Sequence, residues 1–71
     1  MNIGTKLLEV MALLYEREMN CEISTFFDGG LSARLGDVAN GFTWDSGVGW
    51  YDGDELADAL SAAAVQAVLD A

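Results

Sequence analysis

Two turn signals in the middle of the chain restrict how it can fold. The first is the run Asp28-Gly29-Gly30, and the second is the pair Asn40-Gly41, which tolerates the positive φ angles of a type I′ turn. Apolar and polar residues alternate on either side of the turns, a pattern typical of strands with one buried face. The sequence therefore predicts a three-stranded antiparallel meander with strands over residues 21–27, 31–39 and 42–50.

The length of the first loop decides the register, because a slip of one residue moves every side chain of a strand to the opposite face. A three-residue loop with Gly30 in the left-handed conformation pairs apolar residues with one another, and a two-residue Asn40-Gly41 turn extends the same face to the third strand. The expected pairs are Phe27 with Leu31, Thr25 with Ala33, Ile23 with Leu35, Ala39 with Phe42, Asp37 with Trp44, Leu35 with Ser46, Ala33 with Val48, and Leu31 with Trp50. The side chains expected to form the core face of the sheet are Leu31, Leu35, Phe42, Trp44, Val48 and Trp50.

A helix is predicted over residues 5–19, with Thr5 as its N-cap. Its apolar residues recur at helical spacing and define one stripe, formed by Leu7, Leu8, Met11, Leu14 and Tyr15. Val10 and Leu13 widen this stripe, which indicates that the helix is covered on two sides. Two interpretations remain open: the helix is sandwiched inside the core, or it forms a homodimer.

A second helix is predicted over residues 53–70. Asp52 is expected to cap it, with Glu55 three residues later as in a capping box, and further acidic residues complement the positive end of the helix. The residues expected on its buried face are Leu56, Leu60, Ala63, Ala64, Ala67 and Val68. The many alanines make it slim enough to lie close to the sheet. The chain is thus expected to form one small α+β domain, α-β-β-β-α, with both helices packed on one face of the sheet.

The residue types of the chain do not indicate an enzyme, a metal site or a cofactor site. There is no histidine and one cysteine, Cys21, which excludes the usual zinc clusters and a cysteine–histidine nucleophile. The acidic residues between Asp45 and Asp58 lack the alternating spacing of a calcium-binding loop. The stretch Ser46–Gly49 lacks the lysine of a phosphate-binding loop, and its glycines instead predict a bulge or break in the third strand.

Charge restricts the partners of the chain. Twelve acidic residues against three basic ones give a formal net charge of −9, which opposes binding to nucleic acids and to anionic membranes. A basic protein partner is favoured, and the alternative is that acidity only keeps the chain soluble. With one cysteine, and an amino-terminal region whose only basic side chain before the helical pattern is Lys6, we expect a cytoplasmic protein without a signal peptide.

Two groups of residues are candidates for binding a partner. The first lies on the sheet face opposite the core and contains the aromatic and charged residue types that anchor interfaces: Phe26, Arg34, Asp45 and Tyr51. The second is the acidic run at the start of the last helix: Asp52, Asp54, Glu55 and Asp58. Together they predict a small, non-enzymatic interaction protein.

The order of one helix, three strands and one helix resembles the double-stranded RNA-binding domain, which is similar in length. That family presents basic residues at the start of its last helix, whereas this chain has Asp54, Glu55 and Asp58 there, so RNA binding is not expected. In size, acidity and lack of catalytic residues the chain is similar to the small phage-encoded inhibitors of host defence, anti-CRISPR proteins among them. That resemblance implies a decoy whose carboxylates imitate phosphates and occupy a nucleic-acid channel on a basic protein.

Two other functions stay open at this point. In the first, the chain is a dimeric accessory protein that has another partner. In the second it is a small-ligand carrier, with Trp44, Trp50 and Phe42 lining a pocket between the sheet and the helices.

Overall fold

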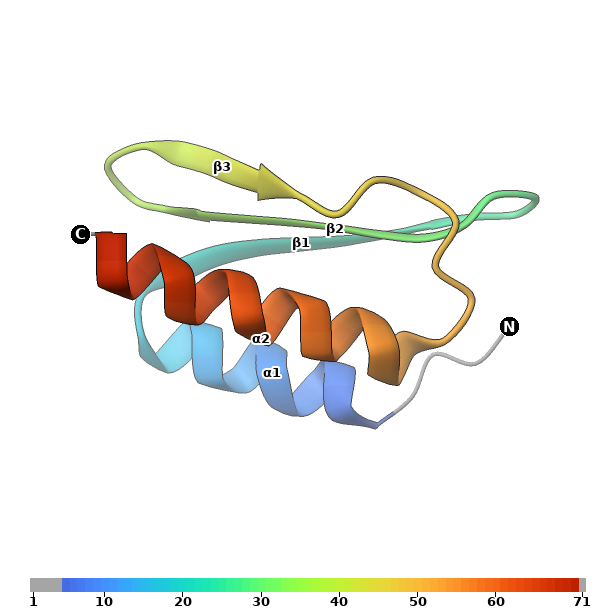
Figure 1. Ribbon diagram of the computed structural model, residues 1–71, viewed down its shortest axis with the longest axis horizontal. Helices are drawn as coiled ribbons and strands as arrows, with labels where there is room; N and C mark the ends of the chain where they lie inside the picture. Colours follow the sequence, from blue (N-terminus) through green and yellow to red (C-terminus); the bar gives the residue numbers. More distant parts are fainter. Residues whose placement is uncertain (1–4, 71) are drawn as a thin grey trace.

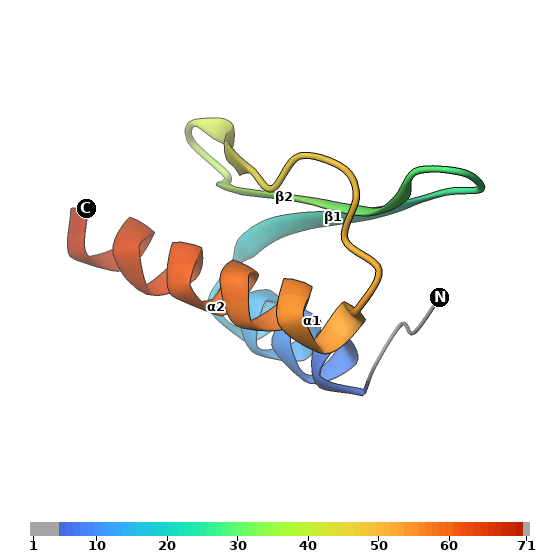
Figure 2. The ribbon, with the colours of Figure 1, turned by 45° about the vertical axis from the view of Figure 1, so that its right-hand side comes forward.

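A computed structural model describes residues 5–70 of the chain, and the lead-in expected over residues 1–4 lies outside the described part. The elements follow in the order α1 (Lys6–Glu16), β1 (Met19–Phe26), β2 (Gly30–Asp37), β3 (Gly41–Asp45) and α2 (Gly53–Asp70). The strands form one antiparallel sheet in the order β1-β2-β3. Both helices lie side by side beneath one face of this sheet and start at the same end (Figures 1 and 2). The predicted α+β meander is confirmed.

The first helix is shorter than predicted. It ends at Glu16 because the N–H of Arg17 already bonds back to the carbonyls of Leu13 and Leu14, and Glu18 then turns the chain with a φ of 60°. The chain therefore enters β1 at Met19, before the expected start of the strand.

Thr5 is the N-cap residue of the helix, as predicted, but its side chain makes no capping bond. The N–H of Lys6 instead donates to Oδ1 of Asp54, 3.2 Å away in the first turn of α2. The start of α1 is thus satisfied by a residue distant in the sequence, a kind of partner that local sequence patterns do not reveal.

The first hairpin keeps the predicted faces but not the predicted register. Thr25 lies opposite Leu31, so the pairing is shifted by two residues from the expected one. The turn closes earlier, with the N–H of Gly29 donating to the carbonyl of Phe26, and this leaves Phe27 fully exposed in the loop instead of packed on the core. The positive φ expected at Gly30 is confirmed. Because side chains alternate with a period of two, the shift moves none of them to the other face.

The second hairpin differs in its turn. Asp37 pairs with Gly41, and the carboxylate of Asp37 holds the loop by accepting bonds from the backbone N–H of Asn40 at 2.6 Å and from its side-chain amide at 3.0 Å. A bulge follows, because the neighbouring residues Leu35 and Gly36 pair with Trp44 and Phe42. Thr43 is therefore the extra residue of β3.

This bulge decides which aromatic residue of β3 reaches the core. Trp44 stays on the core face as predicted, half-buried and opposite Leu35. The prediction that Phe42 shares this face is wrong, since its ring lies on the outer face, 4.5 Å from the guanidinium of Arg34. One inserted residue is enough to separate two side chains that alternation would place together.

The chain leaves the sheet after Asp45 and returns to it briefly. Ser46 still bonds with Ala33 through both its backbone N–H and its hydroxyl, and the expected pairing of Trp50 with Leu31 is present as an isolated bridge. Between them Gly47 and Gly49 adopt positive φ, which confirms the predicted break. Val48 lies in this loop and is exposed, so its predicted place in the core is wrong.

The core lies between the sheet and the two helices. α1 packs beneath β1, and α2 packs beneath β2. The fully buried apolar residues are Leu7, Leu14, Leu31, Ala33, Leu35, Leu56, Ala57, Leu60 and Ala64. Val68, which was expected on the buried face of α2, is exposed. Within the described part of the chain, neither helix combines the length and apolar character required to cross a membrane.

Candidate functional site

The outer face of the sheet brings together the first group of predicted residues only in part. Arg34 occupies the middle of this face, with its guanidinium 3.8 Å from a carboxylate oxygen of Glu22 and 3.9 Å from one of Asp45. The guanidinium of Arg34 also lies over the ring of Phe42. All these side chains remain largely exposed, so the pairs add little stability. They do mean that the charge of Arg34 is paired with carboxylates of the protein itself.

The two aromatic candidates lie apart from Arg34, near the first hairpin. Phe26 ends β1 beside Gly29, and the ring of Tyr51 lies close to Gly30. Both rings are exposed to solvent. The outer face therefore carries two small clusters, one charged and one aromatic, and not the continuous patch that the prediction implied.

The second group gathers at the start of the two helices, and most of it serves the fold. Oδ1 of Asp52 accepts bonds from the N–H groups of Asp54 at 2.9 Å and Glu55 at 3.4 Å, which confirms its predicted capping role. Asp54 accepts the bond from Lys6, and the ammonium of Lys6 lies 3.5 Å from Asp58. Three of the four acidic candidates therefore bind groups of the protein itself.

Removing the cap of α2 tests this assignment. Replacing Asp52 with alanine is expected to lower the free energy of unfolding by about 1 kcal/mol, because two N–H groups of the first turn lose their acceptor. The substitution Asp52→Asn keeps an acceptor oxygen at the cap, so it should cost only a few tenths of a kcal/mol. Urea denaturation followed by circular dichroism measures both changes. Equal losses for the two variants would show that charge, and not capping, is what Asp52 supplies.

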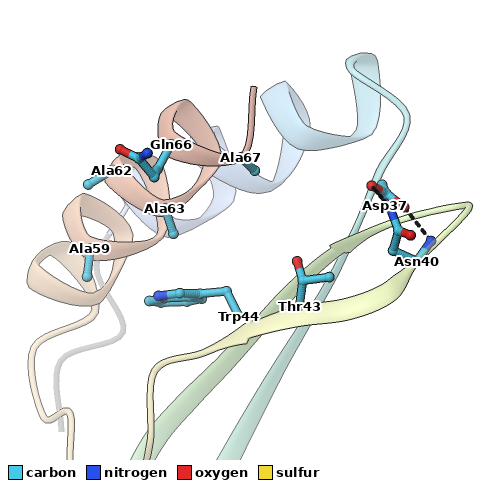
Figure 3. Close-up of a pocket in the computed structure, with 9 residues that line it drawn as sticks. All are labelled: Asp37, Asn40, Thr43, Trp44, Ala59, Ala62, Ala63, Gln66 and Ala67. Carbon is cyan, nitrogen blue, oxygen red and sulfur yellow. Dashed lines mark hydrogen bonds between the residues drawn. The ribbon is translucent and has the colours of Figure 1, made fainter. Parts of the chain in front are cut away.

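A groove lies between α2 and the β2–β3 hairpin, on the core side of the sheet (Figure 3). Trp44 lines it, as the small-ligand interpretation expects, whereas Trp50 and Phe42 are not among the described residues that line it. It encloses about 810 Å³ and is open to solvent. We call it the α2–β3 groove, and its lining residues are Asp37, Asn40, Thr43, Trp44, Ala59, Ala62, Ala63, Gln66 and Ala67. The groove exists because β3 stands off from α2.

The wall and floor of the groove are apolar. The indole ring of Trp44 lies flat beneath α2, with Ala59 and Ala63 above it (Figure 3). Among the described residues the indole N–H of Trp44 has no hydrogen-bond partner, whereas that of Trp50 donates to the carbonyl of Ser46 at 3.2 Å. The alanines were expected to bring α2 close to the sheet. Along this side of the helix they leave an open space instead, because no large side chain fills it.

One end of the groove is negatively charged. The two hydrogen bonds from Asn40 hold the pKa of the Asp37 carboxyl below its ordinary value, so this exposed group is ionised at neutral pH. The last turn of α2 contains no basic residue, so the partial negative charge of the helix end is not compensated there. The groove therefore combines an apolar surface with an electrostatic preference for cations.

Reactive groups are sparse in the described part of the chain. Partial burial raises the pKa of the Cys21 thiol, which disfavours the nucleophilic thiolate. Across residues 5–68 no three side chains of the metal-binding types come together as a cation site. What the described surface offers is shape and charge for binding.

In comparisons with protein families, with curated proteins and with solved structures, no match to this chain was found.

Proposed function

We propose that this is a non-enzymatic interaction protein that binds a basic protein surface. The observation that carries the proposal is the uncompensated negative charge of the folded chain, which has a formal net charge of −9. Of the three basic residues, Lys6 and Arg34 already lie beside carboxylates of the protein itself. Few cations therefore remain to offset the acidic residues on the surface.

This charge selects among classes of partner. Nucleic acids and anionic membranes would be repelled, and a second copy of the chain carries the same excess of negative charge. A basic protein is attracted, and complementary potentials raise both the rate and the specificity of such an association. A nucleic-acid mimic of the kind encoded by phages is the finer form of the proposal, in which exposed carboxylates such as Asp45 and Glu55 take the place of phosphates.

A dimeric accessory protein is a second candidate, favoured by one side of α1. Leu8, Met11 and Tyr15 recur at i, i+3 and i+7 and remain exposed, so the contacts of α1 with β1 and α2 cover only part of its apolar stripe. Sedimentation at tens of micromolar distinguishes the two candidates. A monomer there would exclude the dimer, while a dimer that dissociates in the Leu8→Ser/Tyr15→Ser variant would support it.

Capture of partners at two salt concentrations tests the main proposal. Immobilised protein is incubated with cell extract at about 50 mM and about 500 mM NaCl, and bound proteins are identified and ranked by isoelectric point. We expect basic proteins to be enriched at low salt and reduced about tenfold at high salt, because screening shortens the range of the attraction. The proposal would be contradicted if the captured proteins were acidic or neutral and were retained equally at both salt concentrations.

A matched pair of variants then tests whether the protein is a nucleic-acid mimic. Asp45→Asn/Glu55→Gln and Glu9→Gln/Glu16→Gln each remove two negative charges from exposed positions on different parts of the surface. A phosphate mimic requires specific carboxylates, so only the first variant should bind the partner severalfold more weakly than the wild type does. If both variants lost the same affinity, the basic partner would be attracted by overall charge. Asp45 and Glu55 would then not act as phosphate mimics.

A further inference from the structure

We infer that the α2–β3 groove binds an amphipathic helix of the partner. The apolar side of this helix covers Trp44 and the alanines, and a lysine or arginine of the helix pairs with Asp37. This inference rests on the proposed function, because it identifies where and how a basic partner is held.

The architecture leaves room for one more helix. α1 lies beneath β1 and α2 beneath β2, while β3 stands away from the helical layer (Figures 1 and 2). The groove follows α2 from Ala59 to Ala67, a rise of about 12 Å, which corresponds to about two turns of a helix lying alongside. A helix of the partner in this position would complete the layer beneath the third strand.

The lining suits the apolar side of such a helix. Alanine side chains on α2 allow the backbone of another helix to approach closely, and the flat ring of Trp44 offers a large apolar surface (Figure 3). The indole N–H of Trp44, which has no partner among the described residues, is a donor that a polar group of the bound helix can satisfy. Large aromatic residues in apolar pockets are the usual anchors of protein interfaces.

Charge complementarity selects the occupant. None of the described residues that line the groove is basic, the ionised carboxylate of Asp37 stands at one end, and α2 adds the negative end of its dipole. A second copy of this chain is a poor occupant, because it carries the same net charge and the exposed positions of α1 include Glu9 and Glu16. A helix that combines an apolar stripe with basic residues meets both requirements.

Three synthetic peptides of about 14 residues test the inference with the full chain. The first is an amphipathic leucine–lysine helix, the second replaces its leucines with serine, and the third replaces its lysines with glutamate. Binding is measured by NMR titration of the amide and indole N–H resonances at low salt. We expect the first peptide to bind tightest and to shift the indole resonance of Trp44 more than that of Trp50, and we expect the third not to bind.

Two lysine substitutions on α2 supply a matched control. Ala62 lines the groove and Val65 does not, yet both are exposed, so Ala62→Lys and Val65→Lys make the same charge change without disturbing the core. Ala62→Lys should weaken binding of the leucine–lysine peptide about tenfold, whereas Val65→Lys should change its affinity less than about twofold. Asp37→Asn should weaken binding of the same peptide severalfold and reduce its salt dependence.

The outcomes separate the groove from the proposed function. If both lysine peptides bind equally well and the two α2 variants respond alike, cations bind elsewhere and the groove inference is wrong, while the proposed function stands. If neither lysine peptide binds at low salt, the proposed function fails as well. If the glutamate peptide binds as well as the first, the groove selects apolar surface without charge and the inferred occupant is wrong.

Discussion

Replacing Gly36 with alanine is expected to lower the free energy of unfolding by about 3 kcal/mol, which is a large share of the stability of so small a domain. A Cβ atom at Gly36 would lie against the carbonyl group of Gly41 and 2.7 Å from the Cα of Phe42. These are backbone atoms of β3, and they cannot move away without opening the bulge that sets the register of the strand. The loss is measured by urea denaturation with tryptophan fluorescence.

Gly41→Ala is the matched control for this prediction. A Cβ atom at Gly41 would meet nothing within 4 Å, but the residue has a φ of 71°, so the substitution carries only the backbone strain of about 1 kcal/mol. Gly36→Ala must therefore be clearly the more harmful of the two changes. If it proved as mild as Gly41→Ala, the close approach of β2 and β3 at the bulge would be wrong.

Leu60→Ala is expected to cost about 3 kcal/mol, within the usual range for a leucine whose removal leaves a cavity. The side chain of Leu60 is 0% exposed and packs in the core cluster beneath β2. A domain of this size has a total stability of roughly 4–10 kcal/mol, so this single change removes a large share of it. Thermal and urea unfolding, followed by circular dichroism, should both show the loss.

Leu8→Ala makes the same chemical change at a position that is 69% exposed. Its effect on the monomer should stay within about 0.5 kcal/mol, because the removed atoms already contact water. Similar losses for Leu8→Ala and Leu60→Ala would mean that Leu8 is also covered, as it would be if α1 formed an interface between copies.

Local sequence patterns were sufficient to predict the elements and most of the faces. Glycine and asparagine marked the turns, helical spacing marked α1, and Asp52 marked the start of α2. The register of the first hairpin was wrong by two residues, yet the core face survived, because Leu31 and Leu35 point the same way after any even shift. Alternation is therefore a more robust signal than loop length.

The errors on the second hairpin have a physical cause in its turn, where a side chain contributes to the conformation that turn residues alone were expected to set. The side chain of Asp37 organises the second turn, and the bulge beside Gly36 then moves Phe42 to the outer face. A glycine inside a strand pattern often marks a bulge or a close approach of backbones, so Gly36 was the available signal for this error. For the α2–β3 groove the only signal was Trp44, because the rest of the groove arises from the distance between a helix and a strand.

The bond from the N–H of Lys6 to Asp54 has a consequence for how the protein is made. Its two ends are 48 residues apart, and the acceptor belongs to the last element of the chain. Synthesis on the ribosome proceeds from the amino terminus, so α1 emerges before the carboxylate that satisfies its first turn exists. The beginning of α1 therefore acquires its acceptor only after the sheet has been synthesised and α2 has begun to emerge, which makes the closing of this end of the molecule a late event in folding.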